Sequence, residues 1–274
     1  MKLVTVTCSR DWKLMVLQAV SVQRYVNPCT HIVIVNDQDP HEIDWEGLLR
    51  PIYTKHTLEI VYADPAYWEQ IHNGWVIQQV LKLEAVKLAN EDYLLLDSKN
   101  FFVVNTDINN WQHEGSGILI SKEINRYVWD LWNNTSTMYS QLLDMPLLDV
   151  YYAPETPYVV RQSVALAAID RPNWGSWFIS NSLEHDASEF IYYSYFLKQE
   201  DHEFRYNRRH HSLWPEHANA SLQKWFDEDD FAIMEISGIH RVWLEKAAPA
   251  DKQLMREWLA GLGLLNEHTV AIIR

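Results

Sequence analysis

The chain has 274 residues, of which 47% are hydrophobic and 22% are charged, and its formal net charge is −14. This composition excludes a disordered or fibrous protein, and the length predicts one globular unit over residues 1–274. The negative charge argues against nucleic acid as a partner, because a polyanion would be repelled.

No apolar run is long enough to span a bilayer, and the N-terminus enters a strand pattern instead of a signal peptide. We therefore expect no transmembrane segment and a cytoplasmic protein. The 13 Trp and 14 Tyr residues suit the apolar faces of sugar rings, although a core or an interface is the commoner place for them.

The first hundred residues alternate between strand and helix patterns. Strands are predicted at Lys2–Cys8, His31–Asp37, Thr57–Ala63 and Asp92–Asp97. Helices are predicted at Ser9–Val26, with Ser9 as N-cap, at Trp45–Tyr53 and at Gly74–Asn90. Alternation of this kind predicts an α/β fold with an open, mainly parallel sheet and helices on both faces.

After Asn105 the pattern is looser and indicates a mixed α/β part. Strands are predicted near Ile118–Ser121 and at Phe231–Ile236. Helices are predicted at Pro157–Ile169, at Asp186–Gln199, after the turn that begins at Gly238, and from Pro249 to a cap at Gly261 or Gly263.

Polar residues follow three of the predicted strands. They are Cys8 to Asp11, which include Ser9 and Arg10, then Asn36 with Asp37, and Asp97 to Lys99. Because open α/β sheets bind ligands outside the carboxyl ends of their strands, we expect these groups to converge on one site. Each group alone could equally be a cap or a turn.

The long helix predicted at Gly74–Asn90 carries a polar stripe. At 100° per residue, Gln78, Gln79 and Lys82 fall on one side, and apolar residues cover the other side. The stripe is either an exposed face or a face toward the site, where Lys82 could neutralise a diphosphate.

Seven fragments of the sequence resemble a family of bacterial proteins of uncertain function that is similar to type A glycosyltransferases. In chain order they are TVTCSRD, VIVND, GWVIQQVLKLEAVKL, YLLLDSKNFF, TPYVV, SEFIYYSYF and SGIHR. The resemblance covers nearly the whole chain. It implies a type A (GT-A-like) fold, a nucleotide-binding half over 1–104 and an acceptor-binding half over 105–274. It also implies a UDP- or GDP-linked sugar donor and a glycan or other hydroxyl acceptor.

In proteins of this fold, an Asp-x-Asp motif after the strand usually holds Mn²⁺ or Mg²⁺ against the donor diphosphate. Here Asp97 keeps the first position and Lys99 takes the second. Lys99 could replace the metal as a fixed cation against phosphate. Alternatively, the metal has been lost without replacement, or Lys99 points into solvent.

The resemblance also implies roles for other donor-side residues. Ser9, Arg10, Gln78 and Gln79 would contact the donor. Asp37 would contact the nucleoside, with capping as its alternative. His240 would reach the metal or the diphosphate, next to Arg241 as a phosphate contact, although a lone His is more often structural.

On the acceptor side, Glu189 is the candidate general base, with Asp186 as its competitor. An inverting transfer needs a base to remove the proton of the acceptor hydroxyl. An ordinary acidic residue at a helix N-terminus is the alternative for Glu189. We expect Trp174 and Trp177 to form the acceptor platform.

Two other functions remain open at this point. A non-catalytic carbohydrate-binding relative would use the same aromatic residues, and Lys99 would mark the lost activity. A nucleotidyltransferase is less compatible, because the segment after the first strand contains no glycine and such enzymes carry a Gly-rich loop there.

Overall fold

The computed structural model describes residues 1–113, 126–148, 156–182, 188–199, 210–213 and 236–269. The predicted strand near Ile118–Ser121 lies outside these ranges, as does most of the predicted strand at Phe231–Ile236.

The main sheet has five strands in the order β3-β2-β1-β4-β6. They are β1 (Lys2–Thr7), β2 (Thr30–Val35), β3 (Thr57–Tyr62), β4 (Tyr93–Asp97) and β6 (Tyr158–Val160). The first four run parallel and β6 is antiparallel to β4. The prediction of an open, mainly parallel sheet is confirmed, and the arrangement is consistent with the type A fold.

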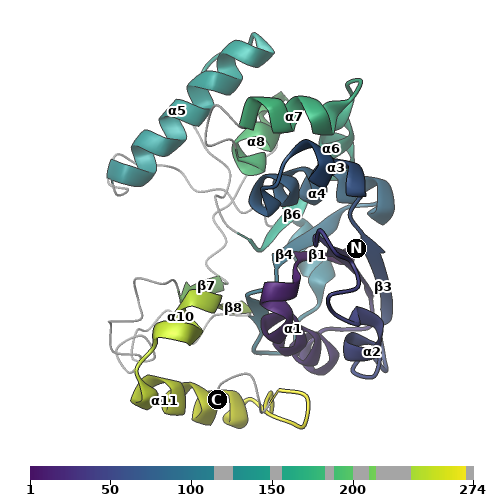
Figure 1. The fold of residues 1–274 in the computed structure, drawn as a ribbon, viewed down its shortest axis with the longest axis vertical. Coiled ribbons are helices and arrows are strands. Elements are labelled where there is room, and N and C mark those ends of the chain that lie inside the picture. Colours follow the sequence, from purple (N-terminus) through teal and green to yellow (C-terminus); the bar gives the residue numbers. More distant parts are fainter. Residues whose placement is uncertain (114–125, 149–155, 183–187, 200–209, 214–235, 270–274) are drawn as a thin grey trace.

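Helices cover both faces of this sheet, as predicted (Figure 1). One face carries α4 (Gly74–Ala89), α6 (Gln162–Ile169), α7 (Trp174–Ser182) and α8 (Glu189–Gln199), which share one hydrophobic core with the sheet. The other face carries α1 (Trp12–Tyr25) and α2 (Trp45–Leu49), and α11 (Pro249–Gly261) adds Met255 and Leu259 to the second core on that side. Helix α3 (Pro65–Gln70) precedes α4, and α5 (Arg126–Leu143) extends away from the sheet.

A second sheet of three strands lies beside α1. Its order is β5 (Asn100–Phe102), β8 (Ile236–Ile239) and β7 (His210–Leu213), with β8 antiparallel to β5 and parallel to β7. Helix α10 (Arg241–Lys246) follows β8 directly. Both sheets therefore join strands from before and after residue 104, where the sequence suggested a division into halves.

Local sequence explains the boundaries of α4. The Asn73 carboxamide oxygen accepts from the backbone N–H groups of Trp75 and Val76, which caps the N-terminus. The helix ends at Asn90, whose φ of 54° lies in the left-handed region that Asn tolerates. Helix α11 ends as predicted, because Gly263 has a φ of +65°.

Two predicted helices begin elsewhere. Residues 158–160 form β6 instead of the first turn of a helix, because they pair with β4, and α6 begins only at Gln162. Ser9 is not a side-chain N-cap: it starts a short 3₁₀ turn, Ser9–Asp11, ahead of α1. Of the helices in the described part of the chain, none is both long and apolar enough to cross a membrane.

Candidate functional site

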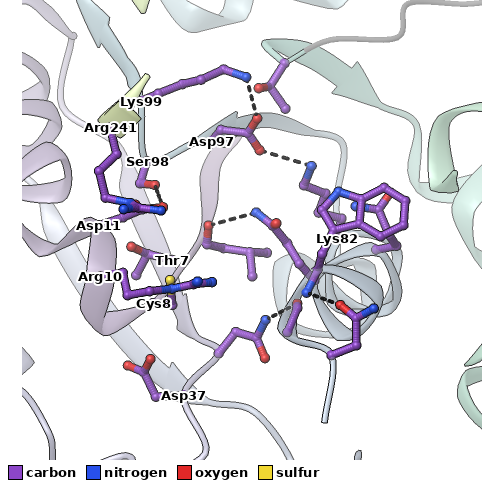
Figure 2. A pocket seen from close by; sticks show the side chains of 18 of the residues that line it. Thr7, Cys8, Arg10, Asp11, Asp37, Lys82, Asp97, Ser98, Lys99 and Arg241 are labelled. Atoms are coloured by element: carbon purple, nitrogen blue, oxygen red, sulfur yellow. Dashed lines mark hydrogen bonds and ion pairs between the residues drawn. The ribbon is translucent and has the colours of Figure 1, made fainter. Parts of the chain in front are cut away.

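A cavity of about 1050 Å³ lies at the carboxyl ends of β1, β2 and β4 (Figure 2). Register explains the convergence, because Val6 lies opposite Asp97 and Thr7 lies opposite Val35. The three polar groups that follow these strands therefore meet at one edge of the sheet, as predicted. The first turns of α4, the segment after β8 and the residues on either side of Glu189 at the start of α8 also contribute to the wall.

Asp37 holds the turn after β1 in place. Its two carboxylate oxygens accept from the backbone N–H of Ser9, at 2.7 and 2.9 Å. Burial raises the pKa of Asp37, and the bonds from Ser9 oppose this effect. The carboxylate thus fits the capping alternative, while both residues also line the cavity.

The polar stripe of α4 faces the cavity, and Gln79 and Lys82 on it are buried. The Gln78 side-chain nitrogen donates to the Val6 carbonyl at 3.5 Å. The Gln79 side-chain oxygen accepts from the backbone N–H of Glu189 at 3.3 Å. Of the two alternatives for this stripe, a face toward the site is therefore the one observed.

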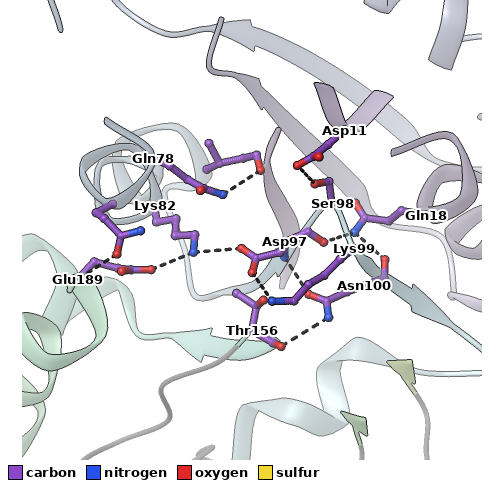
Figure 3. A network of polar contacts seen from close by, with 12 residues as sticks. Asp11, Gln18, Gln78, Lys82, Asp97, Ser98, Lys99, Asn100, Thr156 and Glu189 are labelled. Carbon is purple, nitrogen blue, oxygen red and sulfur yellow. Dashed lines mark hydrogen bonds and ion pairs between the residues drawn. The ribbon is translucent and has the colours of Figure 1, made fainter. Parts of the chain in front are cut away.

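Lys99, Asp97, Lys82 and Glu189 form a chain of alternating charges (Figure 3). Asp97 Oδ2 lies 3.1 Å from Lys99 Nζ, and Asp97 Oδ1 lies 3.0 Å from Lys82 Nζ. Lys82 Nζ also lies 3.0 Å from Glu189 Oε1. Lys99 is 9% exposed, so it does not simply point into solvent.

Neighbouring charges control the ionisation of Asp97 and Lys82. Burial alone would raise the pKa of Asp97, but the ammonium groups of Lys82 and Lys99 outweigh burial and lower it. Burial alone would lower the pKa of Lys82, but the carboxylates of Asp97 and Glu189 outweigh burial and raise it. Both residues therefore stay charged at neutral pH.

Glu189 is fully buried at the start of α8 and does not line the cavity. Its carboxylate faces Lys82, and burial raises its pKa although Lys82 opposes this. The structure therefore does not bring this candidate base to the cavity surface. Asp186, the competing candidate, lies outside the described residues.

The pairing of β8 with β5 carries His240 and Arg241 to the cavity. The Ile239 backbone N–H donates to the Lys99 carbonyl at 3.0 Å. Arg241 Nε lies 3.2 Å from a carboxylate oxygen of Asp11 (Figure 2). Burial, with a smaller effect of Lys99, lowers the pKa of His240, so its imidazole is neutral at neutral pH.

The residues suggested for a metal do not fit Mn²⁺ or Mg²⁺. Both ions need several oxygen ligands, but each oxygen of Asp97 already faces an ammonium group. The His240 Nδ1 accepts from the Val242 backbone N–H at 3.2 Å. Among the described residues, no three His, Cys, Asp or Glu side chains are grouped so that they could hold a metal ion.

The two tryptophans predicted as the acceptor platform do not line the cavity. Trp174 is buried against Phe178 and Tyr192, with ring centroids 5.4 and 6.0 Å away. The Trp177 ring packs against the Arg171 guanidinium at 3.9 Å. Both tryptophans serve the packing of α7, and neither lines the cavity.

Trp68 and Trp75 line the cavity instead, and the sequence analysis missed them. Trp75 is 48% exposed at the first turn of α4. Trp75 could have been predicted from its position one turn before the polar stripe. A helix whose polar side faces a site also brings the residues of its first turn to the edge of that site.

Several buried polar atoms of the cavity wall have no hydrogen-bond partner within the described part of the chain, and three of them come from the ends of β1 and β2 and from α3. They are Thr7 Oγ1, Asn36 Oδ1 and Trp68 Nε1. The orientation of the Asn36 carboxamide is fixed, because its nitrogen donates to the Gly74 carbonyl at 2.7 Å. Buried polar atoms are normally paired, so this corner is equipped to bond a ligand.

Of the four Lys and Arg side chains that line the cavity, Arg10 has the fewest contacts with carboxylates of the described residues. Its side chain is exposed, lines the cavity and contacts the Cys8 thiol. It forms no ion pair with a carboxylate of the described residues. Lys82, Lys99 and Arg241, by contrast, each face at least one carboxylate.

Comparison with known proteins gives little further information. No known protein family matches the sequence, and no curated protein is detectably similar to it. Among solved structures, the chain is similar to the crystal structure of mouse xyloside xylosyltransferase 1 in its apo form. The identity is 9%, the TM-score is 0.46, and the match covers 91% of this chain and 100% of that chain. This likeness is too distant to bear on activity.

Proposed function

We propose that this protein is a glycosyltransferase that moves a sugar from a UDP- or GDP-linked donor to a glycan or other hydroxyl acceptor. The observation that carries the proposal is the cavity itself: four cations line it at the carboxyl ends of parallel strands, in a protein of net charge −14. Ligands of open α/β sheets bind at this edge. Four carboxylates, those of Asp11, Asp37, Glu42 and Asp97, also line the cavity. Its charges are therefore balanced, and an anionic ligand would be repelled less here than the net charge of −14 implies.

In this proposal the donor diphosphate is met by cations of the chain. Arg10 can offer its guanidinium to two phosphate oxygens at once. Lys99 lies at the end of β4, where its charge can offset negative charge that develops on the leaving diphosphate. Binding would then persist without a divalent metal.

The nucleobase is assigned to the corner of Thr7, Asn36 and Trp68. These residues offer a hydroxyl, an acceptor and a donor that lack partners among the described residues. A base presents donors and acceptors along one edge, which suits this set. Asp37 stays the candidate contact for the nucleoside, and with the base in this corner its partner would be the ribose, since Asp37 lines the cavity next to Asn36.

Trp75 replaces Trp174 and Trp177 as the candidate platform for a sugar ring. Its ring is half-exposed at the cavity rim and can stack on the apolar face of a pyranose.

A non-catalytic carbohydrate-binding protein is the second candidate. It is favoured by the burial of Glu189, because this candidate base does not reach the cavity. The carboxylate of Asp97, which lies beside Lys99, already pairs with two ammonium groups and is a poor base. Such a protein would keep the aromatic rim and bind glycans without transferring sugar.

Calorimetric titration separates these candidates. UDP, GDP and several of their sugars are titrated into the protein with Mn²⁺ and again with EDTA, and donor hydrolysis and sugar transfer are followed in parallel. We expect nucleotide binding that survives EDTA, together with turnover of one donor. Binding of glycans but of no nucleotide would favour the second candidate, and nucleotide binding only with Mn²⁺ would contradict the metal-free assignment.

A further inference from the structure

Lys82 lies between two carboxylates that come from distant parts of the chain. Asp97 ends β4 and Glu189 begins α8, and each places one oxygen 3.0 Å from Lys82 Nζ (Figure 3). These two oxygens are therefore at most about 6 Å apart, a separation at which like charges repel strongly inside a protein. The ammonium group offsets this repulsion.

The surroundings of Lys82 are largely shielded from water, so the ammonium group must compensate the neighbouring carboxylates itself. The Lys82 side chain is 4% exposed and that of Glu189 is 0% exposed, whereas the side chain of Asp97 is 20% exposed at the cavity, so water can screen Asp97 in part but not Glu189. The Lys82 ammonium also lies 5.0 Å from the centre of the Phe190 ring. Glu189 Oε2 has no hydrogen-bond partner among the described residues, so Lys82 is the main compensation for this buried charge.

Paired carboxylates of this kind are the usual ligands of hard divalent cations. With Lys99, the group Lys99–Asp97–Lys82–Glu189 has two positive and two negative charges and is neutral as built. A divalent ion added to it would have to displace an ammonium group. The chain thus supplies from its own side chains the positive charge that a metal would bring.

We propose that Lys82 is a built-in substitute for a divalent metal ion, and that removing its ammonium group uncovers a cation site between Asp97 and Glu189. Glu189 is then a positioning residue that fixes Lys82. Only the relevance of this arrangement to sugar transfer rests on the proposed function; the cation site itself does not.

Mn²⁺ binding to the full chain, measured without nucleotide by electron paramagnetic resonance and calorimetry, tests the proposal. The variants are Lys82→Ala and the double variant Lys82→Ala/Glu189→Gln. Lys87→Ala is the matched control, because Lys87 is an exposed lysine of the same helix that pairs with Glu84 at 2.8 Å. We expect no Mn²⁺ binding by the wild type or the control. Lys82→Ala should bind one Mn²⁺, and the double variant should bind it about tenfold more weakly or not at all.

A folded Lys82→Ala protein that binds no Mn²⁺ would overturn the proposal, as would a wild type whose Mn²⁺ binding is lost in Asp97→Asn. Lys82→Gln, which keeps a polar side chain near both carboxylates, serves where Lys82→Ala fails to fold. If neither variant folds alone, both are refolded with Mn²⁺. Recovery of folded protein supports the proposal, and failure to recover rejects it. If the wild type binds no nucleotide, this result would count against the proposed function alone.

Discussion

Arg10 provides the most direct test of the cavity as an anion site. The Arg10→Ala variant should bind UDP about tenfold more weakly, because a charge-assisted hydrogen bond contributes about 1.5 kcal/mol or more. Titration calorimetry in EDTA measures the change. Lys13→Ala is the control, since Lys13 is an exposed cation of α1 outside the cavity wall. An equal loss of UDP affinity in both variants would mean that the change in net charge, and not a contact from Arg10, causes the effect.

His31 predicts a pH dependence of stability. It is fully buried between Thr5 Oγ1, at 2.9 Å, and the Tyr53 hydroxyl, at 2.6 Å, and burial lowers its pKa from 6.5 to about 3. Below pH 6.5 His31 binds a proton in the unfolded chain but stays neutral in the folded protein. Stability is therefore lost as the pH falls from 6.5 toward 3, by about 1.4 kcal/mol per unit from this group.

Urea unfolding of the wild type and of His31→Gln between pH 7 and pH 4 isolates the contribution of His31. Gln cannot titrate, so the difference in the free energy of unfolding between the two proteins should narrow steadily below pH 6.5. A gap that stays constant over this range would show that His31 is not the group responsible.

At single positions, the sequence predicted cavity residues where a regular period applies. Gln78, Gln79 and Lys82 share a helical face, and that face follows from 3.6 residues per turn. The spacing could not place Trp174 or Trp177, because an aromatic side chain suits a core and a cavity wall equally. Which of the two it lines depends on helices from elsewhere in the chain.

The first turn of α4 links helix stability to the cavity rim. Replacing the cap in Asn73→Ala should cost about 1 kcal/mol, because the backbone N–H groups of Trp75 and Val76 lose their acceptor. Asn73→Asp keeps an acceptor and should remain near the wild type. Urea denaturation measures both changes. An equal loss of stability in the two variants would exclude capping as the cause.

Segments with few residues were the hardest to predict. A run of three residues such as Tyr158–Val160 fits a strand or a first helical turn, and its pairing with β4 decides between them. The same applies to β5 and β8, each of at most four residues. By contrast, β2 and β4 are nearly continuous apolar runs and β1 alternates apolar residues with threonine; all three are buried on both faces, and their pattern alone identified them.

Across the molecule, protection from hydrogen exchange should follow position in the main sheet. Strands β1 and β4 are central and almost wholly buried, whereas β3 is an edge strand in which Thr57, Glu59 and Tyr62 are exposed. We expect amides of β1 and β4 to exchange slowest and those of β3 markedly faster. Exchange followed by mass spectrometry tests this order, and slower exchange in β3 than in β1 would contradict it.

The mainly parallel architecture followed from the sequence because alternating strands and helices admit few arrangements. The second sheet did not, because β5 pairs with β8 across about half of the chain. His240 and Arg241 were therefore identified from their motif, while the cause of their arrival at the cavity, the pairing of β8 with β5, was not.

That pairing also sets the order in which the protein can be assembled. During synthesis β1 to β5 leave the ribosome long before β8 exists, and domains begin to fold from the N-terminal side. Asp11 must therefore wait for Arg241, its ion-pair partner from near the far end of the chain. A nascent chain stopped before β8 would lack Arg241, one of the four cations that line the cavity, so the wall of the cavity is completed only late in synthesis.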